Sequence, residues 1–412
     1  MPTHNPRPTL SVEEAQERIL AAVRVLEPER VPLLDALDRV LAEPITADRD
    51  IPPLANSAMD GYAVQGADVA TAPARLRVVG EIAAGYVSDV TVTPGAALRI
   101  MTGAPIPAGA DTVVRFEDTE LDGGWVTVQV PVRAGSDVRP AGEDVKAGQQ
   151  TLAPGHVLRP QEIGMLAALG YTEVSVIRRP RVAILGTGDE VVPPEQEPGP
   201  GQIRDANSYT VAAQVLRHGG VPLMLGIARD REELVREGIR QAVAQRADLI
   251  ITSGGVSVGD FDLVKQVLAA EGEMRFWSIN MKPGRPLAFG VVKSPALEHA
   301  IPLIGLPGNP VSAMISTEQF ARPALLKMQG FETWPWPSVR ARLSEPVRRK
   351  DTRRHYLRVK VRETAKGLVA DVTGDQGSGI LNSLVLADGL AIISEDVSQL
   401  PAGAEVKVLL LT

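Results

Sequence analysis

The chain has 412 residues, of which 44% are hydrophobic and 23% charged, and its net charge is −7. One hydrophobic core rarely serves a chain of this length, so we expect three or four domains. The acidic balance argues against nucleic-acid binding, which needs a basic face. Because the sequence contains no cysteine, disulfides, thiolate metal sites and iron–sulfur clusters are excluded, and any soft metal handled here must bring its own sulfur ligands.

The N-terminal stretch MPTHNPRPTL lacks the basic and apolar regions of a signal peptide, and no apolar run approaches a membrane span of about 20 residues. We therefore expect a cytoplasmic protein with no membrane partner. The histidines are scattered and show no HExxH spacing, which argues against a His-rich zinc site.

Residues 10–44 predict packing structure without chemistry. Ser11 and Glu14 form a capping box, and Ile19, Leu20 and Val23 give the helix that follows an apolar stripe. We interpret this stretch as part of a linker or dimerisation arm.

Residues 51–64, IPPLANSAMDGYAV, form a rigid proline-containing loop that ends in the turn Asp60-Gly61. Asp60 is either a functional carboxylate or a turn residue that bonds its own backbone. Short β-like runs between residues 75 and 132 then indicate a small all-β domain. Within it Thr102 lies in a loop, because Pro105 and Pro107 cannot donate to a sheet, and its hydroxyl could contact a ligand or cap a turn.

The glycine-rich stretch 139–148 ends the β domain and carries the adjacent carboxylates Glu143 and Asp144. A helix is then predicted from Pro160 to Gly170. At this point we expect the chain to return to the first packing region.

Residues 181–330 alternate apolar strands with helical periods, which predicts βαβ units and a parallel sheet. Ligands of such sheets bind beyond the carboxyl ends of the strands. Polar loops fall at those ends, at residues 186–190, 226–230, 253–262 and 305–310. In the last loop Asn309 is a good N-cap and Pro310 fits N1 of a helix through Met328.

The loop at residues 253–262 follows a buried strand and predicts a phosphate site. Gly254, Gly255 and Gly259 would let backbone N–H groups approach an anion, and Asp260 could cap a following helix. The alternative is a strand-to-helix turn that binds nothing. SGGVSVGD lacks the ending of a Walker motif, and GTGDE does not complete a dinucleotide fingerprint.

Charged residues supply the other candidate chemistry. Carboxylates at loop ends form a plausible set for a hard cation such as Mg²⁺: Asp60, Asp144, Glu190, Asp230, Asp260 and Asp262. Helix capping is the competing interpretation for Asp260, and for Asp230, which would form a capping box with Glu233. Lys282 and Arg285 flank a Pro-Gly turn, and together these two basic side chains could bind an oxyanion. The basic run at residues 348–354 is either a solvated face or part of an anion pocket.

The remainder, residues 334–412, returns to β-like runs and predicts a separate small barrel or sandwich. Taken together, the motifs SGGVSVGDFD, MKPGRP, GLPGNPVS, NSAMDGYAV, TGAPIP, GEDVKAG and GTGDE resemble, in order and through nearly the whole chain, the molybdopterin molybdenumtransferases of the MoeA and gephyrin E-domain family.

The resemblance implies an α/β and β multidomain fold. Its parts are a central βαβ, molybdopterin-binding and MogA-like domain (179–330), an elongated, discontinuous linker or dimerisation domain (1–45 with 142–178), a small β domain (46–141) and a C-terminal β-barrel (331–412). It also implies a transferase that uses Mg²⁺ to insert molybdate into adenylylated molybdopterin, with release of AMP. The implied assembly is an elongated homodimer whose cleft lies between the βαβ domain of one subunit and the small β domain of the other. Molybdopterin adenylyltransferase and proteins that deliver the cofactor to molybdoenzymes are further expected partners.

The family's functional positions are carried over residue by residue. The catalytic set is Asp60, Thr102, Asp144, Glu190, Asp230, Asp262 and Lys282, of which Glu190, Asp230 and Asp262 would hold the metal. The binding set is Gly188, Ser253, Gly254, Gly255, Ser257, Gly259, Arg285, Pro307, Gly308, Asn309, Pro310, Ser312, Arg353 and Ser383.

The implied roles follow the chemistry of these groups. The glycine-serine loop would hold a pterin or AMP phosphate, and Lys282 with Arg285 would hold molybdate. Arg353 and Ser383 are the nearest equivalents of an Arg and a Ser that meet molybdate in plant and animal relatives. Family members often carry a basic residue where this chain has Ser278, so either Arg285 or the pair of arginines at 353–354 substitutes for it, or the position matters less.

Two alternatives remain open at this point. One is an ATP-dependent molybdopterin adenylyltransferase, against which the extra β domains and the MKPGRP motif count. The other is a non-catalytic scaffold of the kind gephyrin also provides, against which the absence of a fused second enzyme domain counts.

Overall fold

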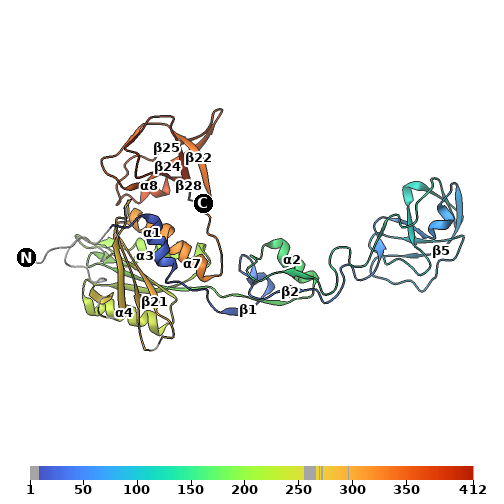
Figure 1. The fold of residues 1–412 in the computed structure, drawn as a ribbon, viewed down its shortest axis with the longest axis horizontal. Helices are drawn as coiled ribbons and strands as arrows, with labels where there is room; N and C mark the ends of the chain where they lie inside the picture. The colour runs from blue at the N-terminus through green and yellow to red at the C-terminus, as the bar shows by residue number, and fades with distance from the viewer. Residues whose placement is uncertain (1–8, 255–265, 269, 271, 296, 412) are drawn as a thin grey trace, which may run out of the picture. The chain divides into compact units, whose positions relative to one another are not determined.

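The protein is described by a computed structural model that covers residues 9–254, 266–268, 270, 272–295 and 297–411 (Figure 1). The chain divides into two compact units, Arg30–Ser175 and Met1–Glu29 with Val176–Thr412. The finer division into four domains stays a prediction. No helix in the described ranges is long and apolar enough to cross a membrane.

The larger unit contains the predicted βαβ sheet, in which four parallel strands are extended by two antiparallel ones. Its strands lie in the order β16 (Val221–Ala228), β13 (Arg181–Thr187), β17 (Leu249–Ser253), β21 (Ile301–Leu306), β20 (Pro286–Val292) and β18 (Gly272–Ser278). The neighbours β16, β13, β17 and β21 are parallel, whereas β20 pairs antiparallel with β21 and β18 pairs antiparallel with β20.

Helices cover both faces of this sheet, as the continuous apolar strands predict. They are α1 (Val12–Leu20), α3 (Asn207–Arg217), α4 (Glu232–Ala244), α6 (Pro310–Ser316) and α7 (Arg322–Met328), with a π-helical turn, Thr317–Ala321, between the last two. Val182 and Ile184 pack into the core with α1 and α3, while Ala183 and Leu185 pack against α4. Figure 1 shows α4 on one side of β21 and α1, α3 and α7 on the other.

The predicted C-terminal barrel is confirmed. Its strands close a ring in the order β24 (Arg354–Thr364), β25 (Gly367–Val372), β22 (Ser338–Leu343), β28 (Glu405–Leu410) and β26 (Gly389–Ile393), with β26 pairing back to β24. The short elements of this part are β23 (Val347–Arg348), β27 (Gln399–Leu400) and α8 (Asn382–Val385).

The barrel joins the βαβ part through backbone pairing and through the core. The two-residue strand β19 (Met281–Lys282) runs parallel to the start of β24, in a register that sets Lys282 opposite His355. Tyr356 and Leu390 of the barrel belong to the same apolar cluster as Ile304 of the sheet. These contacts fix the MKPGRP turn against the barrel wall.

The smaller unit holds the predicted small β domain. Its six-stranded sheet has the order β7 (Thr112–Arg115), β4 (Gly61–Val64), β6 (Ala96–Ile100), β5 (Ala74–Ile82), β9 (Trp125–Val128) and β8 (Thr119–Asp122). The unit also contains the helix α2 (Pro160–Ala168) and the 3-10 turns Leu33–Ala36, Gly66–Val69 and Phe116–Asp118. Two short antiparallel pairs complete it: β2 (Ile45–Thr46) with β11 (Gln150–Leu152), and β3 (Asn56–Ser57) with β10 (Val138–Arg139). Strands β1 (Pro28–Pro32) and β12 (Glu173–Ile177) lie where the chain passes between the units.

Helix ends test several predictions directly. The capping box of Ser11 with Glu14 is confirmed, as are Pro160 and Pro310 in the first turns of their helices. The predicted capping box of Asp230 is wrong, because α4 begins later, at Glu232, and its N-cap Arg231 makes no side-chain capping bond. Asp230 is therefore left for another role.

Candidate functional site

The carboxyl ends of the parallel strands bring the predicted loops together. Ser253 ends β17 in register with Gly186 of β13 on one side and Leu306 of β21 on the other. The N–H of Gly254 donates to the carbonyl of Leu306 at 3.2 Å. The loops after three neighbouring strands thus meet at one edge, as expected for a parallel sheet.

Gly254 is a position that only glycine fits. Its φ is +93°, and a Cβ there would lie 2.5 Å from the carbonyl oxygen of Thr187. This close approach permits the backbone to turn over the strand end. The remaining predicted residues of this loop, Gly255, Ser257, Gly259, Asp260 and Asp262, lie outside the described residues.

Carboxylates gather beside this edge. The N–H of Asp230 donates to Asp189 Oδ1 at 3.3 Å. Burial raises the pKa of the Asp230 carboxyl, and the negative charges of Asp189 and Glu190 raise it further. A cation beside Asp230 would offset this repulsion and favour its ionised form.

Mg²⁺ in proteins binds one or two carboxylates together with substrate oxygens and water, and the predicted metal ligands Glu190 and Asp230 belong to these carboxylates (the acidic corner: Asp189, Glu190 and Asp230). Within the described ranges, no group of three or more His, Cys, Asp or Glu side chains is arranged to hold a metal ion. Asp189, Glu190 and Asp230 therefore do not form a metal site by themselves, and the predicted role of Glu190 and Asp230 in holding Mg²⁺ stays a prediction.

The GLPGNP turn connects the strand ends to a cavity. Asn207 Nδ2 donates to the Gly308 carbonyl at 2.7 Å, and a Cβ on Gly308 would lie 3.8 Å from the Cα of Gly254. Asn309 is the N-cap of α6 but makes no capping bond with its side chain. On the other side of the same turn, Pro307 and Asn309 line the cavity, as does Ser312 of α6.

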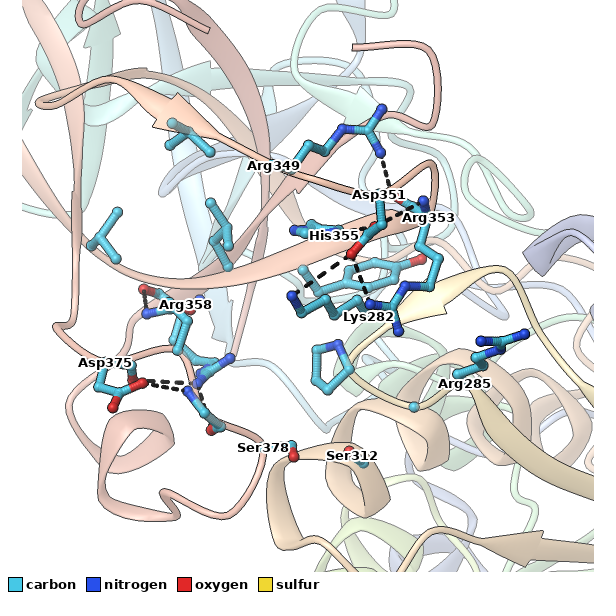
Figure 2. Close-up of a pocket in the computed structure, with 18 of the residues that line it drawn as sticks. Lys282, Arg285, Ser312, Arg349, Asp351, Arg353, His355, Arg358, Asp375 and Ser378 are labelled. Atoms are coloured by element: carbon cyan, nitrogen blue, oxygen red, sulfur yellow. Dashed lines mark hydrogen bonds and ion pairs between the residues drawn. The ribbon is translucent and has the colours of Figure 1, made fainter. Parts of the chain in front are cut away.

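The cavity has a volume of about 860 Å³ and lies between the MKPGRP turn, the start of α6 and the barrel (Figure 2). Basic side chains dominate its charged lining: Lys282, Arg285, Arg348, Arg349, Lys350, Arg353 and Arg358, with Glu345, Asp351 and Asp375 as the acidic members. This surplus of positive charge suits an oxyanion or a phosphate.

Asp351 lies at the centre of the basic lining. Figure 2 shows Lys282, Arg353 and His355 converging on its carboxylate. The distances are 3.8 Å to Lys282 Nζ, 2.7 Å to Arg353 Nη2 and 2.9 Å to His355 Nε2. The hydrogen bond from Arg353, together with that from His355, holds the pKa of Asp351 well below its usual range.

The basic side chains of residues 348–354 make different contacts and do not all face the cavity. Arg349 donates to the carbonyls of Val397 and Arg353 and so fixes the loop. Arg354 faces away from the cavity, where it pairs with Glu13 and with Glu395 at 3.1 Å. Arg354 therefore does not replace the charge absent at Ser278, whereas Arg285 and Arg353 both line the cavity.

Ser383 is buried behind the cavity wall. Its hydroxyl accepts from Arg358 Nε at 3.0 Å and donates to the Ile380 carbonyl at 2.6 Å. Arg358, only 1% exposed, lines the cavity, and burial lowers the pKa of its guanidinium. In this structure Ser383 thus orients Arg358, and its proposed contact with molybdate stays a prediction.

In the smaller unit, Asp60 and Thr102 form a direct pair. Asp60 Oδ1 accepts from both the N–H and the hydroxyl of Thr102, each at 2.7 Å, and the first of these bonds lowers the pKa of Asp60 most. The carboxylate thus bonds a distant loop rather than its own turn. Asp144 is exposed in the same unit, and its N–H donates to the Ile51 carbonyl at 3.0 Å.

Sequence reasoning missed Asp189, Asp351, His355 and Arg358. A signal existed for Asp189, which stands beside Glu190 in GTGDE. Asp351 was hidden inside a basic run, and neither His355 nor Arg358 stands out from an alternating strand pattern. Only the pairing of β19 with β24 brings Asp351 and His355 to Lys282.

Comparisons with known proteins agree with this geometry. Residues 10–170 match the MoeA N-terminal region (domain I and II), residues 183–327 match a probable molybdopterin binding domain, and residues 340–411 match the MoeA C-terminal region (domain IV).

Similar proteins extend over the whole chain. The molybdopterin molybdenumtransferase of Nostoc sp. is 37% identical, covering 100% of this chain and 96% of the relative. Molybdopterin molybdenumtransferase 2 of Mycobacterium tuberculosis is 36% identical, covering 98% and 100%. The crystal structure of the molybdopterin biosynthesis MoeA protein from Pyrococcus horikosii has a TM-score of 0.83 and 33% identity, over 98% of this chain and 100% of that one. On these grounds the chain belongs to the MoeA family of molybdopterin molybdenumtransferases.

Proposed function

We propose that this protein transfers molybdate into adenylylated molybdopterin with the assistance of Mg²⁺, releasing AMP and giving the molybdenum cofactor. One observation carries the proposal. On one side, Pro307 and Asn309 of the GLPGNP turn line the basic cavity. On the other side, Gly308 of the same turn lies close to Gly254 at the end of β17. An oxyanion and an organic phosphate can therefore bind next to each other.

The cavity residues have defined tasks in this reaction. Lys282, Arg285 and Arg353 bind molybdate and polarise its oxygens for attack on the link to AMP. Gly188 and Gly254, where a Cβ would be crowded by neighbouring atoms, would leave room for the phosphate beside the strand ends. The dithiolene sulfurs belong to the pterin substrate, so a chain without cysteine offers no competing thiolate.

The acidic corner would hold the metal through Asp189, Glu190 and Asp230, and Asp262 is a further candidate by resemblance. When bound, Mg²⁺ offsets negative charge on the leaving phosphate. Without Mg²⁺, the negative charges of these carboxylates would repel a phosphate. The protein would therefore supply the metal ligands, and the metal would supply the positive charge.

The experiment is to mix the full-length protein with adenylylated molybdopterin, Mg²⁺ and molybdate and to follow AMP release. Glu190→Gln should abolish AMP release while leaving the fold intact. Glu237→Gln, the same exchange on the exposed side of α4, is the control and should keep wild-type turnover. Unchanged turnover in Glu190→Gln would remove Glu190 from the mechanism.

We also propose a cytoplasmic homodimer in which the small β domain of one copy, with Asp60 and Thr102, completes the cleft of the other. Molybdopterin adenylyltransferase and cofactor-delivery proteins are the further partners proposed. Sedimentation of the full chain at several concentrations tests the dimer, and a monomer at working concentration would contradict it.

The two alternatives are not favoured. An adenylyltransferase would consume ATP with molybdopterin in the absence of molybdate, and a scaffold would bind neither molybdopterin nor AMP. The matched relatives are named molybdopterin molybdenumtransferases, and they align with this chain over 96% and 100% of their own lengths.

A further inference from the structure

The contacts of Asp351 are unusual for a residue in an anion-binding cavity. Its Oδ2 accepts from Arg353 Nη2 and also lies 3.8 Å from Lys282 Nζ. Its Oδ1 accepts from the Arg353 backbone N–H at 3.1 Å and lies 2.9 Å from His355 Nε2. The carboxylate thus occupies the donors expected to bind an oxyanion.

The position of Asp351 is fixed rather than accidental. It lies in the connection between β23 and β24, which Arg349 ties to the carbonyls of Val397 and Arg353. The side chain of Asp351 is 28% exposed and that of Arg353 27%, so both are partly shielded from water. Partial shielding strengthens the interaction of this carboxylate with any charge nearby.

Cations remain in the cavity that this carboxylate does not engage. Across the described part of the chain, the side chains of Arg285 and Arg348 have no hydrogen-bond or ion-pair partner, and both line the cavity. Lys282 keeps N–H donors beyond its long contact with Asp351. The cavity can therefore still attract a dianion, although two of its cations, Lys282 and Arg353, are already paired with Asp351.

We propose that Asp351 is an internal counter-ion of the oxyanion pocket. Its negative charge holds Lys282 and Arg353 in place and lowers the affinity of the pocket for every tetrahedral dianion. The pocket is thereby kept from filling with inorganic ions such as sulfate, and binding of molybdate comes to depend on contacts that the pterin substrate adds. This inference rests on the proposed function, since it takes an oxyanion as substrate.

The test is direct binding of molybdate and of sulfate to the full-length protein without pterin, measured by calorimetry. Removing the carboxylate charge in Asp351→Asn should tighten binding of both dianions by at least about tenfold, because charge repulsion is removed while the shape is kept. Asp371→Asn is the matched control, since Asp371 also pairs with an arginine of the barrel, Arg362 at 2.6 Å, but does not line the cavity. It should leave both affinities unchanged.

Unchanged or weaker dianion binding in Asp351→Asn would overturn the proposal. Asp351→Ser removes the same charge with a different side chain and gives the same test if the Asn variant fails to fold. A tighter affinity cannot come from a damaged pocket, so this result separates the counter-ion role from a purely structural one.

Two further readouts sharpen the test. In the AMP-release assay, KM for molybdate should fall in Asp351→Asn without a rise in kcat, because ground state and transition state gain equally. Burial lowers the pKa of His355 and the Asp351 charge opposes this, so in Asp351→Asn the NMR titration of His355 should move to lower pH. A KM that does not fall, or an unmoved titration, contradicts the proposal.

The outcome is separable from that of the proposed function. If the wild-type protein releases no AMP, the proposed function fails, yet the comparison of dianion affinities still stands. If the wild type releases AMP but Asp351→Asn binds dianions no more tightly, the counter-ion inference alone fails.

Discussion

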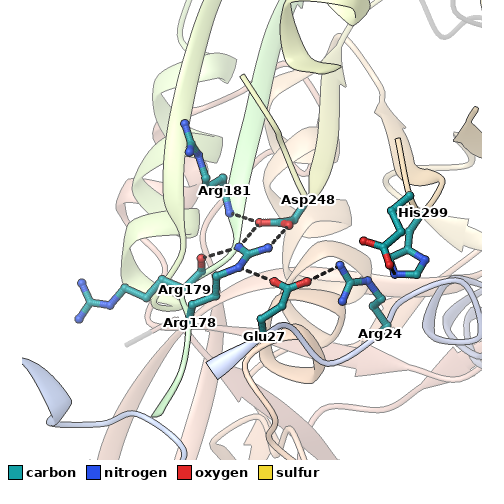
Figure 3. Close-up of polar contacts among 8 residues, drawn as sticks. Arg24, Glu27, Arg178, Arg179, Arg181, Asp248 and His299 are labelled. Atoms are coloured by element: carbon teal, nitrogen blue, oxygen red, sulfur yellow. Dashed lines mark hydrogen bonds and ion pairs between the residues drawn. The ribbon is translucent and has the colours of Figure 1, made fainter. Parts of the chain in front are cut away.

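Two clusters of charged side chains in the larger unit lie near opposite ends of the strands of the βαβ sheet, and they differ in their balance of positive and negative groups. The first is the basic cavity around Asp351 (Figure 2). The second lies at the amino-terminal edge, where Arg178 bridges Glu27 and Asp248 (Figure 3). A cavity of about 920 Å³ borders the second cluster as well, so volume alone does not distinguish the two.

The balance of donors and acceptors does distinguish them. Arg178 Nε donates to Glu27 at 2.7 Å, and both of its terminal nitrogens donate to Asp248 at 2.7 Å. Glu27 also accepts from Arg24 at 2.7 Å. Around Asp351, by contrast, one carboxylate is shared among several cations.

Matched ion pairs of this kind serve stability, whereas an excess of one sign of charge around a cavity is typical of a ligand site. Glu27 lies just before the chain enters the smaller unit and Arg178 just after it returns, so their ion pair joins both passages to Asp248 at the start of β17. The partners of Arg178 raise the pKa of its guanidinium, with Asp248 contributing most. We therefore propose a functional role for the first cluster and a structural role for the second.

The largest expected effect follows from removing a cavity cation. Lys282→Ala should lower kcat/KM for AMP release by at least about 100-fold, because a charge that stabilises the transition state is lost. The melting temperature should change little, since Lys282 is exposed and its ion pair is long. Lys293→Ala, in which the lysine pairs with Glu273 at 3.3 Å away from the cavity, is the control. Equal activity in both variants would contradict the assignment of the cavity.

The reverse pattern is expected at the amino-terminal edge. Arg178→Met should destabilise the protein by about 3 kcal/mol, because it leaves Asp248, whose side chain is 10% exposed, without a cation. Urea unfolding measures this change, and AMP release per folded molecule should stay near the wild-type value. Arg362→Met, which breaks an exposed pair, should cost less than about 1 kcal/mol. A severe loss of turnover in folded Arg178→Met would blur the distinction between the clusters.

Acid should weaken the structural cluster before the cavity. Hydrogen bonding by Arg24 lowers the pKa of Glu27 from 4.5 to about 2. A depressed pKa means that this stabilisation is complete above pH 4.5 and is lost as the pH falls towards 2. The urea midpoint of the wild type should therefore fall more steeply between pH 5 and pH 3 than that of Glu27→Gln. Parallel pH profiles for the two proteins would show that the pairs of Glu27 contribute nothing.

The smallest effect concerns the acidic corner, where unmatched charge has the opposite sign. Burial and two neighbouring carboxylates raise the pKa of Asp230, so its ionised form disfavours folding above its ordinary pKa. Asp230→Asn should raise the melting temperature slightly, on the order of 1 °C, in Mg²⁺-free buffer. It should also diminish the stabilisation that added Mg²⁺ gives the wild type. A variant that melts lower, yet responds fully to Mg²⁺, would remove Asp230 from the metal site.

Much of the fold follows from local patterns. The continuous apolar run before Ser253 predicts a strand buried on both faces, and the alternating pattern after residue 354 predicts a barrel strand. Pro160 and Pro310 mark helix starts correctly because proline suits the first helical turn. The capping prediction for Asp230 failed, because a favourable spacing does not decide where a helix begins.

By itself the sequence determined the classes of domain, their order and the motif residues, since apolar periodicity, turn chemistry and contiguous motifs are local properties. Only the tertiary structure decided which charged side chains share a cavity. Asp351 and His355 meet Lys282 because a two-residue strand pairs with the barrel, and Arg354, next to Arg353, turns away to Glu13. Such proximities join residues about 70 or more positions apart, and no local pattern encodes them.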